Sequence, residues 1–208
     1  MKCMTRTFPF ILAFFLIEVA LAQEAPKPSF EIGDTYKYCV YDLKTDKEKG
    51  RCFTLEYKGK RPAGESGSQS HVFLFNERAE ETLTENMQTL RRDSTNIRFE
   101  PHNFSFDFPL SVGKTWRGSY DVVPAQFPRS NRTKIAKVTE YKDVTVPAGT
   151  FKAFKIEYEN WLNQPGATRP ADEVMYWCPA VNWYCMYESE AFNSERTKLV
   201  EFKRGKGP

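Results

Sequence analysis

Residues 144–159 combine strict alternation of polarity with a turn, and they restrict the fold more than any other stretch. The segment Pro-Ala-Gly-Thr at 147–150 is typical of a tight turn, because proline restricts φ and glycine accepts a positive φ. After the turn, Phe154, Ile156 and Tyr158 share one face of a strand, with charged residues between them. The pattern predicts a β-hairpin with one buried face. A single hairpin is not stable alone, so a larger sheet must surround it.

The rest of the chain repeats this strand pattern, and no extended helical pattern follows the first 22 residues. With 208 residues, of which 40% are hydrophobic, the chain is long enough for one domain with a substantial core. We predict an all-β fold for residues 30–203, a single domain whose curved antiparallel sheet forms a barrel, half-barrel or sandwich. Residues 23–29 are predicted to be a flexible leader, and residues 204–208 a disordered tail.

The first 22 residues have the organisation of a secretory signal peptide. Lys2 and Arg6 precede an apolar run at 8–17, and an Ala-Leu-Ala sequence ends at Ala22. The alternative is a membrane anchor, but the apolar run is shorter than the roughly 20 residues that a spanning helix needs. We therefore expect cleavage after Ala22, a periplasmic or secreted mature protein, and no stable membrane insertion after cleavage.

Four cysteines remain after the signal peptide: Cys39, Cys52, Cys178 and Cys185. An even number in an exported protein indicates disulfides. Of the three possible pairings we favour Cys39 with Cys52 and Cys178 with Cys185, because each bond would close a local hairpin. The alternative for the second pair is a redox or metal site, but its spacing matches neither C-x-x-C nor a zinc knuckle.

The charged residues and the histidines exclude several classes of function. The 30 basic and 27 acidic residues give a net charge of only +3, which is not typical of a nucleic-acid-binding protein. The two histidines, His71 and His102, lie in separate segments and belong to no hydrolase or zinc motif. We therefore expect a protein that is not an enzyme and that binds no metal, cofactor or nucleic acid.

Three segments resemble one group of uncharacterised exported bacterial β proteins. They are FPLSVGKTW at 108–116, VTVPAGTFKAFKIEYE at 144–159 and YWCPAVNWYCMYE at 176–188. The chain is thus similar to the TapB-like family, a domain of unknown function. The resemblance implies a curved antiparallel sheet, related to the open barrels of the lipoprotein carriers LolA and LolB, and it supplies no catalytic residues. Cys178 and Cys185 depart from the family pattern, since such hairpins usually carry aromatic or aliphatic residues there.

Two functions from different classes fit these features. The first is a binding or carrier module that holds an apolar or amphipathic, lipid-like ligand in the curved sheet. The residues proposed for this site are Phe104, Phe106, Phe108, Trp116, Phe154, Ile156 and Tyr158. In the other interpretation, the phenylalanines at 104–108 only plug the core. The second function is a cell-envelope interaction protein that binds a protein or a glycan through surface aromatics, for which the candidates are Tyr41, Trp161, Trp177 and Tyr184. A cavity of several hundred Å³ would favour the carrier.

Overall fold

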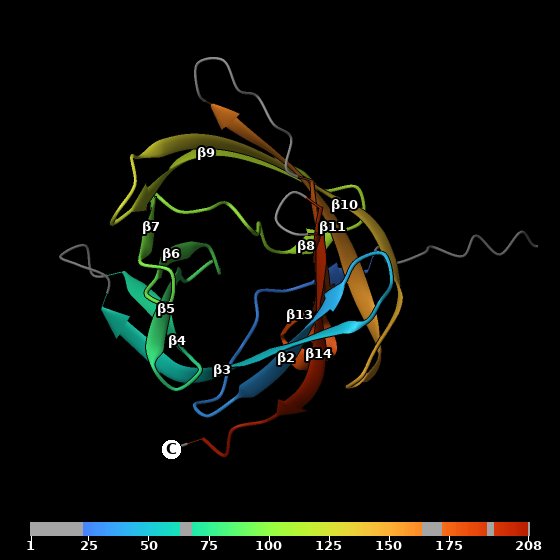
Figure 1. Cartoon of the computed structure of the whole chain (residues 1–208). Helices are drawn as coiled ribbons and strands as arrows, with labels where there is room; N and C mark the ends of the chain where they lie inside the picture. Colours follow the sequence, from blue (N-terminus) through green and yellow to red (C-terminus); the bar gives the residue numbers. More distant parts are fainter. Residues whose placement is uncertain (1–22, 63–67, 164–171, 191–193, 208) are drawn as a thin grey trace, which may run out of the picture.

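The described part of the chain is a closed antiparallel β-barrel (Figure 1). The computed structural model describes residues 23–62, 68–163, 172–190 and 194–207, so the predicted signal peptide and residue 208 lie outside the described residues. Around the barrel the order is β10-β11-β12-β13-β14-β2-β3-β4-β5-β6-β7-β9, and β1 pairs with β8 in a separate sheet. The strands are β1 (Glu24–Ala25), β2 (Thr35–Asp42), β3 (Glu48–Pro62), β4 (Gln69–Phe75), β5 (Ala79–Thr84), β6 (Thr89–Arg92), β7 (Ile97–Glu100), β8 (Leu110–Ser111), β9 (Thr115–Pro124), β10 (Ser130–Val146), β11 (Gly149–Asn163), β12 (Glu173–Cys178), β13 (Trp183–Ser189) and β14 (Glu195–Lys203).

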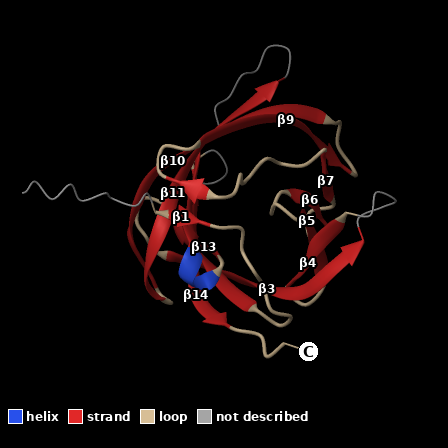
Figure 2. Cartoon of the chain, turned by 180° about the vertical axis from the view of Figure 1, so that it is seen from behind, coloured by secondary structure: helices blue, strands red, loops and turns tan. Residues whose placement is uncertain are grey.

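Helical structure is limited, in the described residues, to the short 3-10 turn η2 (Pro179–Val181) between β12 and β13. Figure 2 shows this turn in blue against the red strands. Among the described residues, no helix has the length and apolar character needed to cross a membrane. The all-β prediction is confirmed, and of the three architectures considered the protein adopts the barrel.

The hairpin predicted at 144–159 is the β10–β11 pair. Val146 pairs with Gly149, so Pro147 and Ala148 form the loop, and Gly149 has a φ of 137°. This positive φ is the reason for a glycine here, because other residues rarely adopt it. Phe154 and Ile156 are fully buried, as their positions on one strand face predict.

A cluster of aromatic residues forms a large part of the hydrophobic core. The Trp183 ring stacks on Phe73 with ring centroids 5.0 Å apart, and Phe30 packs edge-on against Phe73 at 5.2 Å. Next to them, Phe106 packs edge-on against Trp177 at 5.0 Å. Rings of this size bury a large apolar area, so this cluster supplies much of the hydrophobic stabilisation of the barrel.

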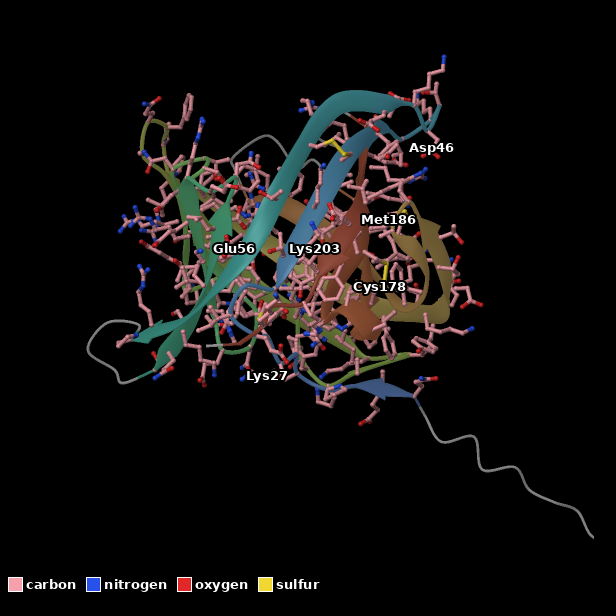
Figure 3. The ribbon with its side chains drawn as sticks, turned by 90° about the horizontal axis from the view of Figure 1, so that it is seen from below. Lys27, Asp46, Glu56, Cys178, Met186 and Lys203 are labelled. Carbon is pink, nitrogen blue, oxygen red and sulfur yellow. A yellow bond between two sulfur atoms is a disulfide. The ribbon has the colours of Figure 1, made fainter. Side chains whose placement is uncertain are left out.

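Both predicted disulfides are present. Cys39 and Cys52 face each other across β2 and β3, and Cys178 and Cys185 join β12 to β13 around η2. Figure 3 shows two disulfides as yellow bonds, with Cys178 labelled. Each bond closes a local hairpin and so restricts the unfolded chain over a short loop.

Residues on either side of the barrel strands make contacts that the sequence pattern does not predict. In the leader at 23–29, Ala25 pairs with Leu110 and is buried. At the C-terminus, Arg204 and the backbone N–H of Gly205 each donate to the buried Asp34 carboxylate, at 3.0 and 2.9 Å. The prediction of a flexible leader and a disordered tail did not include these contacts, because pairing to β8 and to Asp34 depends on tertiary structure that a polar composition does not reveal.

His71 is expected to make the protein less stable in weak acid. It is buried in β4, its Nδ1 lies 3.0 Å from the Tyr57 hydroxyl, and its Nε2 has no hydrogen-bond partner among the described residues. Burial, followed by the charges of Lys60 and Lys27, lowers its pKa from 6.5 to about 4. At a pH above 6.5, the ordinary pKa, the ring is neutral in the folded protein and in the unfolded chain. Between that pKa and about 4 only the unfolded chain takes up the proton, so the free energy of unfolding decreases by up to about 1.4 kcal/mol per pH unit as the pH falls.

The acid effect of His71 is measured by urea unfolding at neutral pH and near pH 4.5, in the wild type and in His71→Gln. Carboxylates titrate equally in both proteins, so the difference between their two pH profiles isolates the histidine. We expect a smaller loss of stability in His71→Gln. Identical pH profiles would show that the His71 ring gains its proton as easily in the folded protein as in the unfolded chain.

Candidate functional site

A cavity of about 520 Å³ occupies the interior of the barrel, away from the aromatic core. Each barrel strand except β2 contributes at least one lining side chain. Successive residues of a strand point to opposite faces of the sheet, so only every second side chain of each strand reaches the cavity. We call this space the barrel cavity.

Residues 101–109, an irregular stretch between β7 and β8 that we call the floor segment, border the barrel cavity through Asn103 and Ser105. Figures 1 and 2 show it crossing the inside of the ring of strands. The Asn103 side chain accepts from the Thr89 N–H at 2.9 Å, and the Tyr158 hydroxyl donates to the Ser105 carbonyl at 2.7 Å. These bonds satisfy buried polar groups of the segment and hold it across the barrel.

Four stacked rings run along one wall of the barrel interior, and we call them the aromatic wall: Tyr184, Tyr38, Phe53 and Phe75. Their successive ring centroids lie 4.7, 5.3 and 5.2 Å apart, with interplanar angles of 18 to 25°. Phe53, Phe75 and Tyr184 line the cavity directly. The wall therefore offers an apolar surface to a molecule inside.

Charged side chains project into the same cavity. Arg92 in β6 lies 3.8 Å from the Glu81 carboxylate in β5, and the Lys134 ammonium in β10 lies 3.7 Å from the Glu173 carboxylate in β12. Lys134 also lies 4.7 Å from the centroid of the Tyr158 ring, within the range of a cation–π contact. Arg92 keeps 45% of its side-chain exposure although it points into the barrel, because the exposed part faces the cavity.

Burial perturbs the protonation of these groups. It raises the pKa of Glu81 against the opposing effect of Arg92, and it lowers the pKa of Lys134 against that of Glu173. Burial, followed by the charge of Glu173, also raises the pKa of Tyr158 far above its usual range. The tyrosine is therefore neutral at physiological pH, and the charges lie in a medium of low dielectric constant, where electrostatic interactions are stronger than in water.

The residues that the sequence pattern proposes for a ligand do not gather around one space. Of that set only Tyr158 lines the barrel cavity, while Phe154 and Ile156 are buried in the core. Phe106 and Phe108 each pack against Trp177 with ring centroids 5.0 Å apart, so they plug the core. The plug interpretation is thus correct for these two rings, and the apolar groove proposed along the whole set is wrong.

Phe104 and Trp116 belong to a different pocket, of about 410 Å³, which Phe106 also lines. Asn103 and Ser105 line the barrel cavity, so alternate residues of the floor segment face different pockets. The floor segment therefore separates the two spaces.

The surface-aromatic set is only partly at the surface. Trp177 is 1% exposed and belongs to the core, and Tyr184 faces the barrel cavity. Tyr41 and Trp161 are partly exposed. Two of the four rings therefore lie in the core or in the cavity wall, and the prediction of a binding surface built from all four is wrong.

The charged residues of the cavity were missed by motif analysis, but a weaker signal was present. Lys134 is in phase with Ala136 and Val138, both fully buried in β10. Likewise, Glu81 is in phase with the buried Leu83 in β5. A charged residue at an inward position of a strand is expensive to bury, so it indicates a polar interior.

The chain matches no protein-family model and no curated protein, but it is similar in fold to several solved structures. One, from Bacteroides fragilis, is described as an exported protein with a YmcC-like fold. Its TM-score is 0.55 and its identity 13%, over 86% of this chain and 100% of that chain. The present chain has this YmcC-like fold. A lipoprotein from Parabacteroides distasonis gives a TM-score of 0.52 at 13% identity, over 86% of this chain and 99% of that chain. The hypothetical lipoprotein YmcC from Escherichia coli gives a TM-score of 0.50 at 6% identity, over 81% of this chain and 84% of that chain.

One of these neighbours is described as exported and the other two as lipoproteins, and the two disulfides of this chain are consistent with an extracytoplasmic location. At such low identity the likeness concerns the fold alone. The relation to the TapB-like family and to LolA and LolB stays a prediction.

Proposed function

We propose that this protein is a non-catalytic, extracytoplasmic binding or carrier protein that holds a small amphipathic ligand in the barrel cavity. Export would follow from the predicted signal peptide, with cleavage after Ala22. The observation that carries the proposal is the barrel cavity itself. Its volume of about 520 Å³ falls in the usual range for small-molecule sites, roughly 300 to 1,000 Å³.

The lining of the cavity supports an amphipathic ligand more than a purely apolar one. The aromatic wall provides an apolar contact surface, and the pairs Arg92–Glu81 and Lys134–Glu173 provide charged partners in the same space. Sites for small molecules typically combine an apolar lining with a few polar groups that fix orientation. The charged side chains of the cavity are paired with one another, and Tyr158 is neutral. These features suit the binding of a ligand, so we propose no catalytic step.

The proposal is tested with N-phenyl-1-naphthylamine, an uncharged apolar dye whose fluorescence increases in an apolar site. We expect saturable binding, and native mass spectrometry of protein purified from the periplasm should show a co-purifying lipid-like mass. The variant Thr197→Trp places a large ring in the cavity lining and should weaken dye binding at least about tenfold. Thr115→Trp, on an exposed position of β9, is the matched control and should bind like the wild type. Bare protein in repeated native spectra, together with no saturable dye binding, would contradict the proposal.

A further inference from the structure

Positive charge exceeds negative charge inside the barrel cavity. The ionisable lining residues, tyrosines aside, are three cations, Arg92, Arg132 and Lys134, and two carboxylates, Glu81 and Glu173. Arg92 and Arg132 both lower the pKa of Lys134, so the cations are near enough to affect one another. With every carboxylate ionised, the lining carries one positive charge in excess, which a ligand with a single negative charge would balance.

The ion pairs inside the cavity are longer than a charge-assisted hydrogen bond. Arg92–Glu81 and Lys134–Glu173 measure 3.8 and 3.7 Å. On the outer surface Arg196–Glu188 measures 2.6 Å, and Lys198–Asp46 measures 2.7 Å. A charge-assisted N–H···O bond is about 2.7–2.9 Å long, so the two interior pairs attract through charge without forming such bonds. A closer anion would make bonds to these cations that their carboxylate neighbours do not make.

Burial increases the benefit of such an anion. Lys134 is 6% exposed, and a buried ammonium that lacks strong hydrogen bonds is costly. Arg92 presents its exposed surface to the cavity, and a guanidinium binds carboxylate or phosphate oxygens in a bidentate manner. The two side chains therefore combine a buried ammonium, whose carboxylate partner Glu173 lies 3.7 Å away, with an accessible planar donor.

We propose that the ligand is an anionic amphiphile, whose carboxylate or phosphate group lies against Arg92 and Lys134 and whose apolar part contacts the aromatic wall. This inference rests on the proposed function, since it specifies the chemistry of a ligand in the same cavity. The anion adds hydrogen bonds to both cations, and the rings of Phe53, Phe75 and Tyr184 receive the apolar chain.

The headgroup is tested with three probes that share one ten-carbon chain: decanoate, 1-decanol and decyltrimethylammonium, measured by isothermal titration calorimetry. We expect decanoate to bind at least about tenfold more tightly than decanol, because its carboxylate gains charge-assisted hydrogen bonds to Arg92 and Lys134 that the alcohol cannot make. Decyltrimethylammonium should bind most weakly. Decyl phosphate, titrated in parallel, distinguishes a phosphate from a carboxylate headgroup, and tighter binding than decanol by either anion supports the proposal.

Arg92→Gln should reduce the affinity for decanoate about tenfold, towards that for decanol, and should leave decanol binding unchanged within about twofold. Arg91→Gln is the matched control, because Arg91 is exposed on the same strand, pairs with Asp93 and does not line the cavity. The double variant Lys134→Met, Glu173→Gln removes the other ion pair without leaving an isolated buried charge. It should give a similar loss for decanoate, and melting curves show whether each variant is folded.

The outcomes separate this inference from the proposed function. If the three probes bind equally and Arg92→Gln changes nothing, the anionic headgroup is disproved, while a binding function for the cavity stands. If decyltrimethylammonium binds most tightly, the carboxylates dominate the site and the inference is also overturned. If neither these probes nor the uncharged dye binds, the proposed function itself fails.

Discussion

Replacing Trp177 with alanine is expected to destabilise the protein by about 3–5 kcal/mol, the usual range for removing a large buried aromatic side chain. Trp177 is 1% exposed and packs against Phe106 and Phe108, with ring centroids 5.0 Å away in each case, and against Trp183 at 5.9 Å. Truncation removes these contacts and leaves a cavity in the core. Urea unfolding followed by circular dichroism measures the change in the free energy of unfolding.

Trp161→Ala is the matched control, because Trp161 is the same residue type in a partly exposed position of β11. A change of about 1 kcal/mol or less is expected for it. If Trp177→Ala lost no more stability than Trp161→Ala, Trp177 would lie outside the core, and the interaction surface of exposed aromatics would again be the better interpretation.

Gly118→Ala is expected to destabilise the protein by about 1–3 kcal/mol, which is typical of forcing an extra carbon into a packed site. A Cβ at this position would overlap the ring of Phe104, from which its distance would be only 2.2–2.4 Å. The glycine is required by this close approach of the ring. Phe104 itself has a φ of 51°, unusual for a bulky residue, so the floor segment holds it in a strained conformation.

The double variant Gly118→Ala, Phe104→Ala separates a steric cause from a general effect on β9. If the clash with the ring is the cause, adding Phe104→Ala should cost less in the Gly118→Ala background than in the wild type, which a double-mutant cycle measures as a coupling energy. If the losses of stability from the two substitutions were strictly additive, the effect of alanine at position 118 would not depend on the Phe104 ring. Because Asn103 and Ser105 border the barrel cavity, displacing Phe104 should also change binding of the naphthylamine dye.

The site was harder to predict than the fold, and the residues show why. Phe104, Phe106 and Phe108 alternate as a strand would, yet they lie in the irregular floor segment and divide between a pocket and the core. Arg92 and Lys134 belong to no motif, so nothing near them in the sequence identifies them as partners. Their common cavity exists only because β6 and β10 belong to one closed sheet.

The sequence alone determined the strand pattern, the turn at Gly149 and both disulfides, because these depend on period-two alternation and on short loops. Alternation states which face a side chain occupies within its own strand. Only the tertiary structure decided that the sheet closes into a barrel, that the floor segment crosses it, and that Glu81, Arg92, Lys134 and Glu173 meet inside. These features depend on strand order and closure, which bring residues far apart in the chain into one space, and a local pattern carries no information about such distances.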